Sequence, residues 1–327
     1  MEVESAAPDA RKKGSVLIEA LFAGLSSALL FALFLVLPIA GSLALAFAGV
    51  PLVRLTHRRG LTAGTGGSLL AAAVLAGLGF ASGSAAEALA GASLGLAATL
   101  LPVLFTGLVR RGMAPSRGFL LLSAVGFGLL AGVLILRESA GAPPLAVEIG
   151  KAFDAMSPAA AAPSSGVDGE TSARMAATFR RFKEFAQAYW LGLVGASWAI
   201  AAAISFYFGA RSARPAPSAE SVRFEELRLP AGVVALFVGA GAGFLLLPAD
   251  LRPWAGDILI PLAALYFLTG LSIICHFARK WFRARILRAG LYALVVYFPL
   301  NVGVGLLGIF DWYADFRHRG EKAEKQP

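Results

Sequence analysis

The sequence predicts an all-α protein, a polytopic bundle of membrane-spanning helices, and three kinds of observation predict it. Of 327 residues, 57% are hydrophobic and only 15% are charged, whereas a soluble domain is about a quarter charged. The apolar runs approach the length of about 20 residues that crosses the hydrocarbon. Lys and Arg gather at alternate turns between these runs, as in membrane proteins. Such a chain needs a surface that faces lipid.

On the length criterion we expect about nine spans, within a range of about eight to ten. Roughly five form a first group over residues 15–136, and roughly four form a second group over residues 188–310. The second run is short and contains a proline, so its alternative is a tilted or re-entrant element. In chain order the expected spans are Ser15–Leu37, Ile39–Val53, Leu61–Ala81, Leu89–Val109, Arg117–Leu136, Ala188–Phe208, Ala231–Pro248, Asp257–Phe277 and Gly290–Phe310.

The basic turns predict the orientation of the bundle. By the positive-inside rule they lie in the cytoplasm, together with the N-terminal tail of residues 1–14, which precedes an uncleaved first span. The polar C-terminal tail of residues 311–327 conflicts with this rule, because a full crossing by Gly290–Phe310 leaves Arg317 outside. We expect that crossing, and the alternative is a break near Pro299–Asn301 after which the chain turns back. The basic turns contain Arg11, Lys12 and Lys13; Arg54, Arg58 and Arg59; Arg110, Arg111 and Arg117; Arg211, Arg214, Arg223 and Arg228; and Arg279, Lys280, Arg283, Arg285 and Arg288.

Residues 137–187 form an expected extracytoplasmic insert. Its middle, Ser157–Gly169, is rich in Ala, Pro, Ser and Gly and predicts a flexible loop. The arms Leu145–Met156 and Thr171–Tyr189 are amphipathic, and the second arm places apolar residues at helical spacing. We expect this second helix to lie in the membrane interface, and the alternative is a lid over an external cavity. Its apolar residues are Met175, Phe179, Phe182, Phe185 and Ala186.

Small residues recur along the first span at Ala20, Gly24, Ala28 and Ala32. Residues four positions apart share one face of a helix. Small side chains let another helix approach closely, and in lipid this close packing replaces the missing hydrophobic driving force. The face therefore predicts helix docking, either inside the bundle or onto a separate subunit.

Polar and aromatic residues within the spans are candidates for ligand binding. Pro299 frees a backbone carbonyl in mid-span and Asn301 follows it, so a kink there exposes backbone to a cavity, as in the discontinuous helices of transporters. Trp190 and Trp198 follow the insert, where we expect an external cavity. Glu19, near the start of the first span, either compensates the helix dipole or pairs with a buried cation or a docking subunit.

The C-terminal stretch Leu265–Arg317 carries the most specific pattern, and the segment FEELRLP precedes an earlier span at residues 224–230. This order resembles the YybS-like family of bacterial membrane proteins of unknown function. The resemblance implies a location in the bacterial cytoplasmic membrane. It also implies a distant likeness to the S components of energy-coupling-factor transporters, which dock a membrane coupling subunit through small-residue faces. Apart from the resemblance, the terminal cluster indicates an interface anchor with a salt bridge. The residues concerned are Gly270, Tyr292, Gly308, Asp311, Trp312, Asp315 and Arg317.

Enzyme and metal-site motifs are absent from the sequence. It contains no P-loop, no HExxH and no GxSxG at a strand-to-helix turn. Its three histidines are far apart, and its one cysteine, Cys275, lies within an apolar run. We therefore expect no enzymatic activity, no metal and no cofactor. The basic residues are spread over several turns rather than gathered in one patch, so we expect no nucleic-acid partner.

Together these features predict an integral membrane protein that binds or translocates a small solute of unknown identity, as an S-component-like transport subunit. Its partners are then the lipid bilayer and a membrane coupling subunit, because the sequence lacks an ATPase motif of its own. The alternative is a non-transport scaffold or regulatory protein that acts through helix contacts in the cell envelope. A polar cavity at membrane depth favours transport, and a solid bundle packed with Ala and Gly favours scaffolding.

Overall fold

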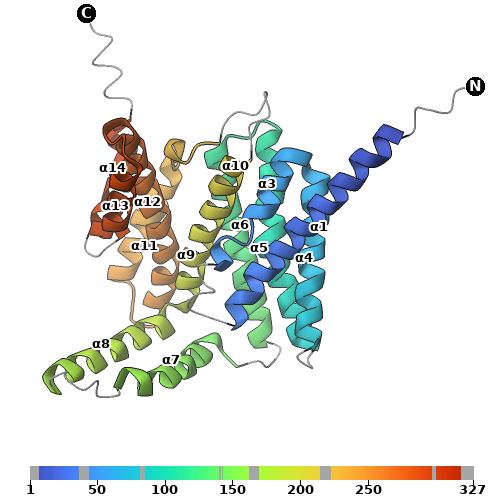
Figure 1. The fold of residues 1–327 in the computed structure, drawn as a ribbon. Helices are drawn as coiled ribbons and strands as arrows, with labels where there is room; N and C mark the ends of the chain where they lie inside the picture. Colours follow the sequence, from blue (N-terminus) through green and yellow to red (C-terminus); the bar gives the residue numbers. More distant parts are fainter. Residues whose placement is uncertain are drawn as a thin grey trace, which may run out of the picture. The chain divides into compact units, whose positions relative to one another are not determined.

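The computed structural model describes residues 7–36, 44–81, 85–139, 141, 143–161, 169–213, 222–296 and 300–317. Every regular element in these ranges is helical (Figure 1), which confirms the all-α prediction. A π-helical segment, Ile204–Phe208, joins α9 to α10, and a short 3₁₀ turn covers Phe224–Glu226. The α-helices are α1 (Ala7–Val36), α3 (Val50–Arg59), α4 (Leu61–Ala81), α5 (Ala85–Arg110), α6 (Pro115–Ser139), α7 (Leu145–Ala161), α8 (Gly169–Ala188), α9 (Trp190–Ala203), α10 (Gly209–Ser212), α11 (Ala231–Leu246), α12 (Arg252–Trp281), α13 (Arg285–Val296) and α14 (Leu300–Ala314).

Six of the described helical stretches are long and apolar enough to cross a membrane. The chain is therefore polytopic, as predicted. The count of about nine spans is not confirmed, because α11 is an apolar helix of only 16 residues and two other expected spans are interrupted. The six stretches are Gly14–Leu33, Leu61–Ala81, Gly91–Arg110, Pro115–Leu136, Trp190–Ser212 and Arg252–Trp281.

The expected span Ile39–Val53 is not a single helix in the described part of the chain. Residues 37–43 lie outside the described ranges, and α3 begins only at Val50. Pro51 stands in the first turn of α3, where a missing N–H costs no helical hydrogen bond. Leu52 is fully buried, and α3 packs against α1, α4 and α5. This segment is therefore a short helix within the bundle, and it ends at the basic residues His57–Arg59.

The chain divides into two compact units. Unit 1 contains residues 1–127, 198–230 and 265–327, and unit 2 contains residues 128–197 and 231–264.

Unit 1 contains a bundle in which small residues let helices approach closely. A Cβ atom at Gly24 of α1 would lie 2.6 Å from the carbonyl oxygen of Gly67 of α4, and one at Gly95 of α5 would meet the side chain of Leu75 of α4. The α1–α4 contact continues into a buried apolar cluster. In lipid, such close approach gains dispersion contacts that larger side chains would prevent. The cluster consists of Ala28, Phe31, Ala71 and Leu75.

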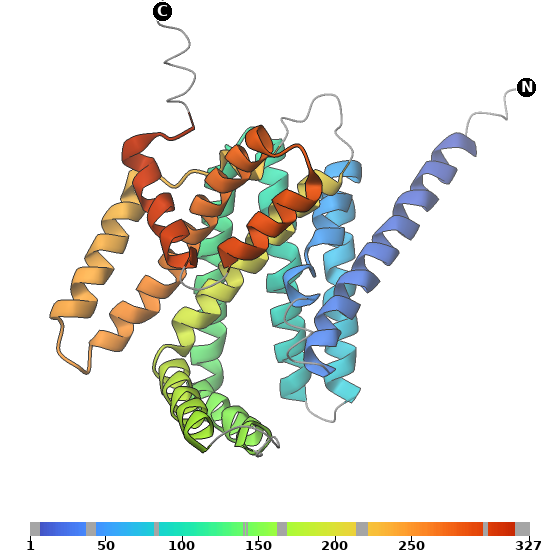
Figure 2. The ribbon, with the colours of Figure 1, turned by 60° about the vertical axis from the view of Figure 1, so that its left-hand side comes forward.

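The last two helices of unit 1 interrupt the expected span Gly290–Phe310. α13 and α14 have 12 and 15 residues and meet at 95° (Figure 2). Arg279, near the end of α12, forms an ion pair with Glu225 at 2.8 Å, and Arg317, just after α14, donates to the Glu225 carbonyl at 2.5 Å. Both ends of the α13–α14 pair therefore lie at the same end of unit 1. The single straight helix expected over Gly290–Phe310 is not observed, and the 95° bend fits the alternative in which the chain breaks and turns back.

Unit 2 contains the amphipathic helices of the insert and a buried carboxylate. The Asp257 carboxylate of α12 accepts a hydrogen bond from the backbone N–H of Gly192, in the first turn of α9, at 2.7 Å. A carboxylate at this position satisfies an orphan helix donor and compensates the positive end of the helix dipole. Tyr189, just before α9, packs against Phe244 of α11 with the two rings tilted by 51°, and it lies against Gly256. These contacts fix the start of α9 against α11 and α12.

Candidate functional site

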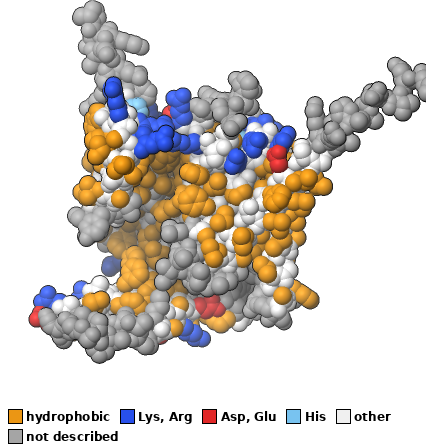
Figure 3. All heavy atoms as spheres, viewed as in Figure 1, with side chains coloured by type: hydrophobic (Ala, Val, Ile, Leu, Met, Phe, Trp, Pro, Cys, Tyr) orange, Lys and Arg blue, Asp and Glu red, His pale blue; other side chains and the backbone are white. Residues whose placement is uncertain are grey.

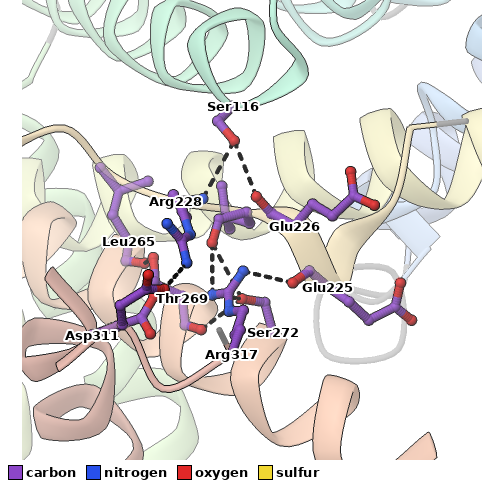
Figure 4. A network of polar contacts seen from close by, with 11 residues as sticks. Ser116, Glu225, Glu226, Arg228, Leu265, Thr269, Ser272, Asp311 and Arg317 are labelled. Carbon is purple, nitrogen blue, oxygen red and sulfur yellow. Dashed lines mark hydrogen bonds and ion pairs between the residues drawn. The ribbon is translucent and has the colours of Figure 1, made fainter. Parts of the chain in front are cut away.

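A buried guanidinium joins three segments of unit 1 (Figure 4). After α14 the chain turns at Asp315, which has a φ of 42° in the left-handed region that Asp tolerates better than most residues. The Arg317 side chain then donates to the carbonyls of Glu225 (2.5 Å) and Leu227 (2.9 Å), and to the Ser272 hydroxyl of α12 (2.9 Å). It also forms an ion pair with Asp311 of α14 at 3.3 Å. One side chain thus ties the 224–230 segment to α12 and α14.

The pair of Arg317 and Asp311 is largely removed from solvent. Their residues are 8% and 6% exposed. Burial lowers the pKa of Arg317 below its ordinary value, although the adjacent Asp311 carboxylate opposes this shift. A guanidinium stays protonated in proteins, so the site holds a buried positive charge. The Asp311 carboxylate neutralises this charge, and two backbone carbonyls accept its hydrogen bonds. Removing either charge would leave the other uncompensated.

Two glycines bring α12 and α14 close enough for these contacts. A Cβ atom at Gly308 of α14 would collide with the Tyr266 carbonyl of α12, and one at Gly270 of α12 would collide with the Val304 carbonyl of α14. The two backbones therefore touch where these glycines lie. Asp311 follows Gly308 by three residues and Ser272 follows Gly270 by two, so the polar network begins where the glycine contact ends.

The 224–230 segment is also fastened to the start of α6. The Ser116 hydroxyl donates to the Glu226 carbonyl at 3.4 Å and accepts the Arg228 backbone N–H at 3.3 Å. The Arg228 guanidinium forms an ion pair with the Asp315 carboxylate. Both side chains of this pair are about two-fifths exposed (43% and 41%), so water screens it more than the pair at Arg317.

A hollow of about 810 Å³ opens beside this network. Five of its lining residues are Lys or Arg and two are Glu, which gives a formal charge of +3 with His276 neutral. Arg279 pairs with Glu225 at 2.8 Å, and the Glu226 carboxylate lies 3.8 Å from Arg223. Figure 3 shows Lys and Arg side chains gathered over the end of unit 1 where α12 ends. The lining residues are Arg223, Glu225, Glu226, Arg228, His276, Arg279, Lys280 and Arg317.

The comparison with known families agrees with this architecture. Residues 26–312 match a family described as predicted membrane protein, DUF2232. The chain belongs to this family. No curated protein matches it, and no solved structure does. The DUF2232 match includes the glycine contact and Asp311, and it ends before Asp315 and Arg317.

Most of the cluster predicted at the C-terminal end of this DUF2232 protein comes together in the structure. Gly270 and Gly308 form the helix contact, and Asp311, Asp315 and Arg317 form the ion pairs described above. Two members lie apart from the network. Tyr292 of α13 lies beside the Cys275 thiol of α12. Trp312 is half exposed (50%) and packs edge-on against Tyr313, as expected of an interface aromatic.

The four predicted ligand-binding residues have other surroundings. Trp198 is buried in unit 1, where its indole N–H donates to the Leu122 carbonyl at 3.2 Å and its ring covers Gly126. Trp190 belongs to unit 2. Asn301 is half-buried on α14, and Pro299 lies outside the described residues. Trp190, Trp198 and Asn301 are not among the residues that line the hollow.

The small-residue face of α1 is in contact with α4. Gly24 touches the backbone of Gly67, and Ala28 is 2% exposed, while Ala20 and Ala32 are half-buried. This is the alternative in which the face docks inside the bundle. Beside it, Glu19 accepts two hydrogen bonds from the Arg59 guanidinium of α3, at 2.9 and 2.6 Å. Glu19 therefore has a cationic partner, although both side chains are about one-third exposed.

Two residues of the site, and a buried carboxylate of unit 2, escaped the sequence analysis. Ser116 and Ser272 are ordinary in sequence, and their roles depend on the backbone carbonyls and N–H groups that the fold places near them. Asp257 offered a usable signal, because a carboxylate within an apolar run is costly unless it has a partner. Its partner is the N–H of Gly192, 65 residues away in sequence.

Proposed function

We propose that this membrane protein binds a small anionic solute in the basic hollow beside Arg317. The observation that carries the proposal is the lining of the hollow, in which Lys and Arg outnumber Glu by five to two. Cationic side chains that converge on one concave surface attract anions and form charge-assisted hydrogen bonds with them. Guanidinium groups in particular match the planar geometry of carboxylate and phosphate oxygens.

The residues of the hollow divide into a supporting group and a binding group. The two terminal nitrogens of Arg317 donate to Asp311, Ser272 and two carbonyls, so this side chain holds the 224–230 segment in place. Arg279 and Lys280 are exposed at the end of α12, the Arg228 side chain lies on the supported segment, and Arg223 directly precedes this segment. These four side chains are the ones that face an incoming solute.

The same charge pattern suggests the side from which the solute arrives. The positive-inside rule assigns the basic end of unit 1 to the cytoplasm, so the solute would enter from the cytoplasm rather than through the external cavity expected from the sequence. Transport would follow if the α13–α14 pair, which turns back at 95°, moved against α12. Energy would then come from a coupling subunit or an ion gradient. Because α4 covers the small-residue face of α1, a coupling subunit would have to bind another surface of the protein.

Titration of the purified full-length protein in detergent with inorganic phosphate, and separately with citrate, tests this proposal by calorimetry. We expect saturable binding that weakens as salt rises, because the contacts are electrostatic. Lys280→Gln should weaken binding by roughly tenfold, since a hydrogen bond to a charged group contributes about 1.5–3 kcal/mol. Arg288→Gln is the matched control, because Arg288 belongs to the same basic turn as Lys280 and does not line the hollow. The proposal would be rejected if neither phosphate nor citrate bound, or if the two substitutions weakened binding equally.

A further inference from the structure

We propose that the α7–α8 hairpin of unit 2 is a membrane-surface module whose partner is an anionic phospholipid bilayer. This inference is independent of the hollow in unit 1, because it rests on different residues. It chooses between the two alternatives that the sequence left open, an interfacial helix and a lid.

The hairpin is held together by contacts along one side of α8. Phe153 of α7 packs against Phe179 and Phe182 of α8, with ring centroids 5.3 and 5.6 Å apart. The Lys183 ammonium pairs with the Asp154 carboxylate at 2.5 Å, and the Gln187 amide donates to the Ala146 carbonyl at 3.2 Å. These contacts fix which face of α8 meets α7 and which faces remain open.

An apolar face of α8 remains exposed beside α7. Met175 is 58% exposed, Phe182 is 55% exposed and Phe185 is 40% exposed. Met175 and Phe182 are seven residues apart and Phe185 follows three later, so the three side chains share one face. A face with two phenylalanines and a methionine is unfavourable in water, and insertion into the boundary between headgroups and acyl chains would bury it.

A row of basic residues borders this apolar face. Arg174 directly precedes Met175, and Arg181 directly precedes Phe182. Successive residues are about 100° apart around a helix, so the two arginines lie to one side of the apolar face. Phe185 lies between the two rows, because it follows Arg181 by four residues. Arg174 also pairs with Glu170 at 2.6 Å, whereas Arg180 and Arg181 form no ion pair among the described residues. Long basic side chains at the edge of an inserted face reach up to headgroup phosphates.

The direction of α8 fits the same partner. Within unit 2, α8 runs across the direction of α11 (Figure 1), and α11 is uniformly apolar, as expected of a helix inside the bilayer. A helix that crosses the direction of its membrane neighbours lies along the bilayer surface. Charge favours anionic lipid, because α8 carries four Lys or Arg against two Glu, and the two helices together carry five basic against four acidic residues.

Spin labels on the full-length protein in vesicles test the proposal. In a Cys275→Ser background, labels are placed at Met175→Cys and Phe182→Cys, with Ala177→Cys as the matched control about 200° around the helix from Met175. The vesicles contain either phosphatidylcholine alone or equal parts of phosphatidylcholine and phosphatidylglycerol. In the mixed vesicles we expect the labels at 175 and 182 to collide with oxygen and the label at 177 to collide with a water-soluble nickel chelate.

The charge requirement is measured in the same vesicles. Arg181→Gln should lower the ratio of inserted to exposed label at 182 by about fivefold in the mixed vesicles and leave it unchanged in phosphatidylcholine alone, because each basic residue near an anionic surface contributes about 1 kcal/mol. Nickel accessibility at 175 and 182 equal to that at 177 would overturn the proposal. Protection of these two labels from both oxygen and nickel would indicate a lid packed on protein, which also overturns it.

Discussion

Arg317 and Asp311, six residues apart at the end of α14, form a buried ion pair at 3.3 Å, and the same guanidinium holds the carbonyls of Glu225 and Leu227. This relationship joins the two stretches that were most specific in sequence, residues 224–230 and the C-terminal cluster. The cost of desolvating two charges offsets much of the attraction within a buried pair, and we infer that this pair acts mainly by fixing one arrangement of its neighbours. In this protein the arrangement is the position of the 224–230 segment against α12 and α14.

Asp311→Asn should destabilise the protein by roughly 3 kcal/mol, because it leaves the buried Arg317 charge without its carboxylate. Thermal or denaturant unfolding of the purified protein, followed by intrinsic fluorescence, measures the change. Asp315→Asn is the control, because its pair with Arg228 is partly exposed and an exposed pair contributes less than about 1 kcal/mol. Equal losses from the two substitutions would show that Arg317 does not depend on Asp311.

Gly308→Ala should separate α12 from α14, because its methyl group would collide with the Tyr266 carbonyl. We expect a loss of about 1–3 kcal/mol, which is typical of overpacking, and weaker anion binding in the adjacent hollow. Gly303→Ala on the same helix meets no atom within 4 Å, so it should be neutral or slightly stabilising through its better helix propensity. Unfolding curves of the two variants provide the test, and a neutral Gly308→Ala would contradict the close contact.

His57, in the last turn of α3 and outside the six membrane stretches, predicts a pH dependence. Burial, assisted by the nearby Arg110 charge, lowers its pKa to about 4, whereas an unfolded histidine titrates near 6.5. Because the lowered pKa belongs to the folded state, the unfolded state binds more protons between these values, and stability falls as pH decreases from about 6.5 toward about 4.

To test this, the free energy of unfolding is measured for wild type and for His57→Gln, each at about pH 7 and at about pH 5. Wild type should lose roughly 1–2 kcal/mol more than the variant over this range, after allowance for the partial exposure of the imidazole. Carboxylates titrate in both proteins, so they cancel in the comparison. Parallel losses would mean that the folded imidazole accepts a proton as easily as the unfolded one.

The return of the α13–α14 pair predicts that both of its ends are accessible from one side of the membrane. In a Cys275→Ser background, Arg283→Cys and Tyr313→Cys should react with an impermeant maleimide from the same side. Ala177→Cys on α8 should react from the other side, because the insert is expected outside the cytoplasm. Labelling of positions 283 and 313 from opposite sides would restore the straight crossing.

Spans with a continuous apolar run were predictable from sequence, and the reason is physical. In lipid every backbone polar group must be satisfied within the segment, so about 20 apolar residues almost require a helix. Leu61–Ala81 was predicted with the bounds that the structure has, and Arg117–Leu136 differs from the observed stretch by two residues at its start. The glycines at 270 and 308 and the charged residues after them were also predictable as a related set.

The interior partners were not predictable, because they depend on contacts between residues far apart in the chain. An apolar run does not reveal a 95° bend between α13 and α14, since both halves have the composition of a crossing. Trp198 resembles a ligand-binding aromatic in sequence, yet its indole N–H is used by the Leu122 carbonyl 76 residues earlier. The spacing of Lys and Arg identified the basic turn at residues 279–288, but only the fold shows that Arg317 lines the same hollow as Arg279.

The DUF2232 match covers residues 26–312, and this has a practical consequence for anyone who trims the gene to that boundary. A clone that stops at 312 keeps Asp311 but omits Arg317, and one that starts at 26 keeps Arg59 but omits Glu19. Each cut would orphan one half of an ionic contact. Expression vectors for this protein should therefore extend through Arg317 and begin well before Glu19.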